Sequence, residues 1–125
     1  MRLNTLLLIA GLLGIAFGVA FLTAPAQTLA LYGVTTDATG IIMTRFCGAA
    51  FLQLGLILYL VKDVNEPATQ RGILIGATIG SAAGLLVALV AQLQGLVNGM
   101  GWTTVAIYAL LLAGYGSHVA RPRPA

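Results

Sequence analysis

Charged residues are scarce in this chain of 125 residues, since Asp, Glu, Lys and Arg together make up only 7% of it. A soluble domain carries roughly 25% charged residues. The sequence is 59% hydrophobic, and its mean hydropathy is +1.00. So few charges cannot cover the surface of a globular protein in water. The composition therefore predicts a chain whose natural surroundings are lipid, and the length predicts no more than one domain.

The residues on which catalysis and metal binding usually depend are also rare. Cys47 is the only cysteine, which excludes a disulfide or a cysteine-based metal cluster within one chain. No Ser–His–Asp set, no phosphate-binding loop and no acidic residue within a hydrophobic run is present. We therefore expect a protein that is not an enzyme and that holds no metal or cofactor. A single axial bond from His118, the only histidine, to a haem or chlorophyll is a remote exception.

Long hydrophobic runs are what the chain does contain, at about 3–23, 40–61, 72–93 and 101–119. A membrane-spanning helix needs about 20 apolar residues, and these runs are continuous rather than alternating. The pattern predicts an all-α integral membrane bundle of four transmembrane helices, as a single domain over 1–125. The first run is longer than the apolar core of a signal peptide, so we expect a retained helix there. A short interfacial helix is expected at about 25–32, with Pro25 in its first turn and Gly33 after its end.

The positive residues predict the orientation of the bundle. Arg2 precedes the first run, Lys62 and Arg71 lie between the second and third, and Arg121 and Arg123 follow the fourth. The other two connections contain no Lys or Arg. Because cytoplasmic loops carry the excess of Lys and Arg, both termini are predicted to be cytoplasmic. The scattered positive charge gives no reason to expect nucleic-acid binding, and the lipid bilayer is the expected partner.

Glycine and alanine recur at every fourth position in two of the predicted helices. Gly14 and Gly18 belong to the first row, and the second row contains Gly72, Gly76, Gly80 and Gly84. Rows of small residues let membrane helices approach each other closely. One interpretation is packing within the bundle. The other is a face that receives another subunit, as a homo-oligomer or in a larger membrane complex, or a groove for a lipid tail or pigment.

Arg45 is the charge that needs an explanation, because it lies inside the second predicted helix. Charged groups inside a membrane are costly and are usually paired or face a polar cavity. Asp37, Gln92, Asn98 and Trp102 are expected at a similar depth, so these residues and Arg45 are the candidate site for an anionic or amphipathic ligand. The alternative is structural, with Arg45 extending outward to bind Asp37 or loop carbonyls.

Several short motifs resemble small, mostly uncharacterised four-helix bacterial membrane proteins that are loosely grouped as DoxX-like. They are Pro25 with the run Leu31-Tyr32-Gly33-Val34, the run Arg45-Phe46-Cys47-Gly48, Arg71 followed by glycines, and Asn98 with Gly101-Trp102. The resemblance extends over nearly the whole chain. It implies a four-helix fold in the bacterial inner membrane and implies little about activity.

Together these features predict a small non-catalytic membrane protein that packs against itself or a larger complex through its glycine-rich helix faces. A binder or transporter of an anionic or amphipathic ligand at the Arg45 site is the alternative. A redox-linked accessory protein is a third, weaker hypothesis.

Overall fold

The computed structural model describes residues 2–120 of the chain. Its helices are α1 (Leu3–Thr23), α2 (Pro25–Leu31), α3 (Ala38–Leu60), α4 (Pro67–Leu93) and α5 (Gly101–Ala120). All of them except α2 are long and apolar enough to cross a membrane, by length and composition. The prediction of an all-helical chain with four long apolar helices is confirmed. Arg121 and Arg123, which contributed to the predicted orientation, lie outside the described residues.

Two acidic residues fix where α3 and α4 begin. Asp37 is the N-cap of α3, and its Oδ1 accepts a hydrogen bond of 2.9 Å from the backbone N–H of Gly40. Glu66 is the N-cap of α4 and accepts from the hydroxyl and backbone N–H of Thr69 and the backbone N–H of Ala68. These bonds, that of the Thr69 hydroxyl first, hold the pKa of Glu66 below its usual value. Pro67 also favours the first turn of a helix. The helix α4 therefore begins at Pro67 rather than at residue 72, where the apolar run was predicted to begin.

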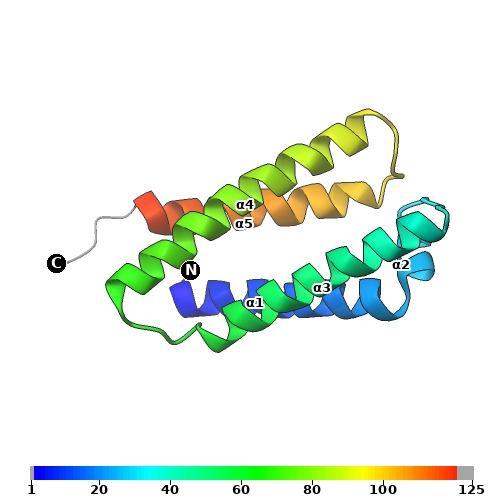
Figure 1. The fold of residues 1–125 in the computed structure, drawn as a ribbon. Helices are drawn as coiled ribbons and strands as arrows, with labels where there is room; N and C mark the ends of the chain where they lie inside the picture. The colour runs from blue at the N-terminus through cyan, green and yellow to red at the C-terminus, as the bar shows by residue number, and fades with distance from the viewer. Residues whose placement is uncertain (1, 121–125) are drawn as a thin grey trace.

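The long helices associate as two pairs. Figure 1 shows α1 beside α3, and α4 beside α5. The Cα atoms of α3 lie more than 8 Å from those of α4 and α5 throughout, so the two pairs meet mainly through α1 and α5. We call the end where α1 and α4 begin the terminal end, and the opposite end, where α2 lies, the α2 end.

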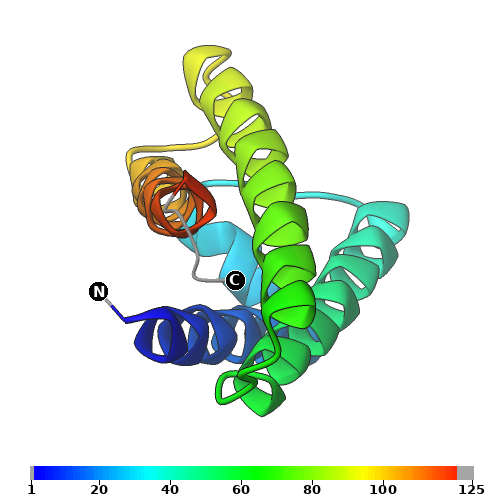
Figure 2. The ribbon, with the colours of Figure 1, turned by 90° about the vertical axis from the view of Figure 1, so that its left-hand side faces the viewer.

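The best-buried side chains come from all four long helices and lie near the terminal end. Figure 2 views the ribbon from that end. They are Leu6, Leu7 and Ala10 of α1, Leu58 of α3, Leu74 of α4 and Tyr115 of α5. Leu74 has no exposed surface. Many other large apolar side chains are exposed, as lipid-facing residues of a membrane protein are. This small core holds the two pairs together.

Candidate functional site

Arg45 lies on α3, about 10 Å along the helix from Ala38. Its side chain is exposed, and it makes no hydrogen bond or ion pair with any residue that the structure describes. Asp37, the expected partner, instead caps α3. An exposed guanidinium at this depth can extend along the helix to the headgroup region, as long basic side chains do near helix ends. Within residues 2–120, the Arg45 guanidinium is therefore left exposed to its surroundings.

Two of the other candidates, Gln92 and Asn98, do meet at the α2 end. Gln92 Nε2 donates a 3.2 Å hydrogen bond to the Asn98 carbonyl oxygen. Asn98 in turn donates from its backbone N–H to Tyr32 O at 2.9 Å and from Nδ2 to Leu31 O at 3.2 Å. These bonds join the connection between α4 and α5 to the end of α2, so the described polar contacts of Asn98 serve to fasten two loops.

The remaining candidates do not form one site with Arg45. Trp102 is 51% exposed on the first turn of α5. The Cα atoms of α3 lie more than 8 Å from those of α4 and α5, and within residues 2–120 Arg45 makes no hydrogen bond or ion pair with Gln92 or Trp102. His118 is buried near the end of α5, at the opposite end of the molecule. No group of three or more His, Cys, Asp or Glu residues that could hold a metal occurs within residues 2–120.

The glycines of α1 lie against the backbone of α3. A Cβ atom at Gly14 would be 2.9 Å from the Cα of Gly55, and one at Gly18 would be 2.5 Å from the backbone nitrogen of Leu52. The glycines of α3 lie equally close to the backbone of α1, because a Cβ at Gly55 would be 2.5 Å from the backbone nitrogen of Ile15. The two helices touch main chain to main chain, which only glycine permits.

The glycines of α4 have a different environment. Gly84 lies against the ring of Tyr108 from α5. Gly72, Gly76 and Gly80, in contrast, have no other part of the described chain within 4 Å of a Cβ built on them. These three residues, with the exposed surface around them, are called the glycine face of α4 below. They form a row of small residues along a membrane helix that nothing in residues 2–120 fills.

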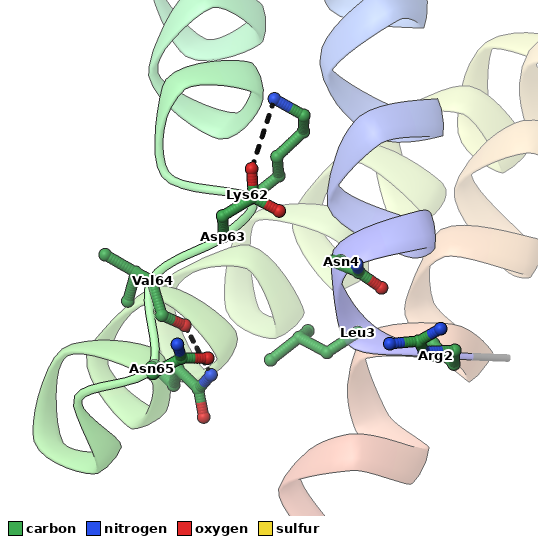
Figure 3. Close-up of a pocket in the computed structure, with 8 residues that line it drawn as sticks. Arg2, Leu3, Asn4, Lys62, Asp63, Val64 and Asn65 are labelled. Atoms are coloured by element: carbon green, nitrogen blue, oxygen red, sulfur yellow. Dashed lines mark hydrogen bonds and ion pairs between the residues drawn. The ribbon is translucent and has the colours of Figure 1, made fainter.

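A polar cavity of about 340 Å³ lies at the terminal end, between the start of α1 and the loop that joins α3 to α4 (Figure 3). Its lining consists of Arg2, Leu3, Asn4, Lys62, Asp63, Val64, Asn65 and Gln70. The sequence reasoning used Arg2 and Lys62 only as markers of orientation. It missed the cavity because the two segments are distant in the chain and meet only when α1 pairs with α3.

Comparison of the chain with protein-family models, with curated proteins and with solved structures found no match.

Proposed function

We propose that the chain is a non-catalytic, multi-pass protein of the bacterial inner membrane that binds another transmembrane helix through the glycine face of α4. The supporting observation is the contrast between its glycines and those of α1. Gly14 and Gly18 are covered by the backbone of α3, whereas Gly72, Gly76 and Gly80 meet nothing within 4 Å.

Lipid alone does not account for a row of glycines. A position that faces acyl chains accepts any apolar side chain, and glycine has the lowest helix propensity of all residues except proline. A second helix does account for the row, because small residues at four-residue spacing permit close contact between backbones. Ile75 and Ile79, which are 38% and 66% exposed beside the glycines, would add apolar contact on the flanks of such a crossing.

The orientation that we propose places both termini in the cytoplasm. Arg2, Lys62 and Arg71 all belong to the terminal end, where α1 and α4 begin and α3 ends. Arg45 is the only described Lys or Arg nearer to the α2 end. The bias of positive charge toward the cytoplasm supports this orientation.

The test is the variant Gly80→Leu, compared with Ala82→Leu as a matched control. Both residues are exposed on α4, but Ala82 is turned about 120° away from the centre of the glycine face. Because a Cβ atom at residue 80 has no other part of residues 2–120 within 4 Å, we expect native helix content together with at least about tenfold weaker association. Association of a second copy is measured by energy transfer between labelled chains in bilayers. A different partner subunit is sought by native mass spectrometry after mild detergent extraction.

Retention of the partner by Ala82→Leu and its loss by Gly80→Leu would support the proposal. A wild-type chain that is a bare monomer in both experiments, or a Gly80→Leu variant that assembles normally, would show the proposal to be wrong.

A further inference from the structure

We propose that the cavity at the terminal end binds a phosphate group, supplied by the headgroup of an anionic phospholipid. Its volume of about 340 Å³ lies at the lower end of the range for small-molecule pockets. Two cations, a carboxylate and several side-chain amides line it (Figure 3). This inference is independent of the helix that the glycine face of α4 binds.

Arg2 supplies one positive charge of the lining. Its side chain is exposed and makes no hydrogen bond or ion pair within residues 2–120. A guanidinium presents its N–H groups in a planar fork that matches two oxygens of a phosphate group. A headgroup phosphate beside the first turn of α1 would provide the acceptors that this residue lacks.

Lys62 supplies a second positive charge, and its side chain turns back to the last turn of α3. Its Nζ is 4.2 Å from the centre of the Tyr59 ring and 3.4 Å from the Tyr59 carbonyl oxygen. It also lies 3.6 Å from a carboxylate oxygen of Asp63, whose side chain is 75% exposed. An ion pair this exposed contributes little and is readily exchanged for another anion. Asp63 therefore weakens the attraction for phosphate without removing it.

Neutral donors complete the lining. Asn4 Oδ1 accepts a 2.9 Å hydrogen bond from the backbone N–H of Thr5, and Nδ2 remains available as a donor. Gln70 Nε2 donates a 2.6 Å hydrogen bond to Val64 O, which fixes the loop that forms the far wall. Leu3 and Val64 add apolar surface, which suits the part of a phospholipid between headgroup and acyl chains. A phosphate ester with an apolar neighbour fits this mixed lining.

A phosphate group could come from a lipid headgroup or from free phosphate, and the position of the cavity favours the lipid headgroup. It lies where the apolar spans α1 and α4 begin and α3 ends, which is the depth of lipid headgroups. Basic residues beside a membrane attract anionic lipids, with a gain of about fivefold in binding per residue. An anionic phospholipid reaches this depth by lateral diffusion, so we commit to it rather than to free phosphate.

The experiment measures binding of short-chain phosphatidylglycerol, short-chain phosphatidylcholine and inorganic phosphate to the purified full chain in neutral detergent. The variants are Arg2→Gln, Lys62→Gln and, as a matched control, Arg71→Gln. Arg71 has the same charge at the same end but does not line the cavity. We expect the wild type to prefer phosphatidylglycerol, and each cavity variant to weaken that binding at least about tenfold, because a hydrogen bond to a charged group contributes more than general attraction to a basic surface. Arg71→Gln is expected to stay within about twofold of the wild type.

Two results would overturn the site. One is equal binding of the two lipids by the wild type. The other is an equal loss for Arg71→Gln and Arg2→Gln, because that pattern indicates general attraction to a basic surface. Competition by inorganic phosphate would support the cavity as a phosphate site but assign it to a soluble ion, whereas absence of competition supports the lipid. If Arg2→Gln does not fold, the variant Asp63→Asn tests the site instead. Tighter binding of phosphatidylglycerol by Asp63→Asn than by the wild type would support the site. Unchanged or weaker binding would overturn it.

Discussion

Two rows of glycine with the same four-residue spacing have opposite environments in this molecule. Gly14 and Gly18 of α1 lie under the backbone of α3, where a methyl group would collide with main-chain atoms. Gly72, Gly76 and Gly80 of α4 have nothing within 4 Å, although α4 packs beside α5. The spacing of small residues therefore identifies a helix face that another helix can approach closely. Which helix packs there depends on the size of the side chains that the neighbouring helix presents.

The neighbouring helices explain the difference between the rows. α3 presents Gly48 and Gly55 to α1, so both sides of that crossing are small and the backbones meet. α5 presents the ring of Tyr108 to Gly84, and this contact uses only the last glycine of the α4 row. A close crossing needs small residues on both helices. A row of small residues that meets no such helix within residues 2–120 is available for contact with a helix of another chain.

The largest expected effect comes from Gly55→Leu, which attacks the α1–α3 crossing at its tightest point. Its Cβ alone would lie 2.5 Å from Ile15 N and 2.6 Å from Gly11 O, and neither backbone atom can move without separating the helices. We expect a loss of about 3 kcal/mol or more in the free energy of unfolding, and little folded protein. Thermal unfolding in detergent and the yield of monodisperse protein measure it. A Gly55→Leu variant of native stability would refute the described crossing.

A matched pair of alanine variants, Gly14→Ala and Gly76→Ala, sharpens the comparison. The methyl group at residue 14 would lie 2.9 Å from the Gly55 Cα and 3.0 Å from Phe51 O, so we expect a loss of about 1–3 kcal/mol. The methyl group at residue 76 meets nothing, so the dilute monomer should remain within about 0.5 kcal/mol of the wild type. Reversible unfolding by SDS in mixed micelles gives both values. Equal effects at the two positions would remove the distinction between the rows.

A modest effect is expected for Asn98→Ala, which loosens the α2 end without touching either glycine row. The variant loses the hydrogen bond from Nδ2 to Leu31 O and the bond that Oδ1 accepts from the backbone N–H of Met100. The backbone bond to Tyr32 O is retained, so we expect a loss of about 1 kcal/mol. The same unfolding experiment measures it, with Asn65→Ala, in the other polar loop, as the control. A loss as large as that of Gly14→Ala would mean that the loop contact, rather than the helix crossing, dominates stability.

The sequence was sufficient to predict the long helices, because continuous apolar runs leave few alternatives in a membrane. α1 occupies Leu3–Thr23, the range expected from its hydropathy. The start of α4 was placed too late, because residues 67–71 are polar and only the cap formed by Glu66 and Pro67 makes them helical. Hydropathy locates the part of a helix that lies in lipid, whereas capping side chains decide where the helix begins.

The sites were harder to predict, because they depend on which helices pair. Similar depth in the membrane led us to group Arg45 with Gln92, Asn98 and Trp102. Depth is only one coordinate, and α3 pairs with α1 rather than with α4 or α5, so a common site for these residues stays a prediction. The meeting of Gln92 and Asn98 was foreseeable, since they are close in sequence and share one short connection. The cavity beside Arg2 and Lys62 required tertiary structure, because its walls come from distant segments.

The contrast between the two glycine rows has an evolutionary consequence. Folding of the single chain constrains residues 14, 18 and 55 whatever the protein associates with, since main-chain atoms surround them. Folding places no such constraint on residues 72, 76 and 80. If a partner occupies that face, as proposed, only that association constrains these glycines, and lineages that lose the partner should accumulate larger side chains at the three positions first.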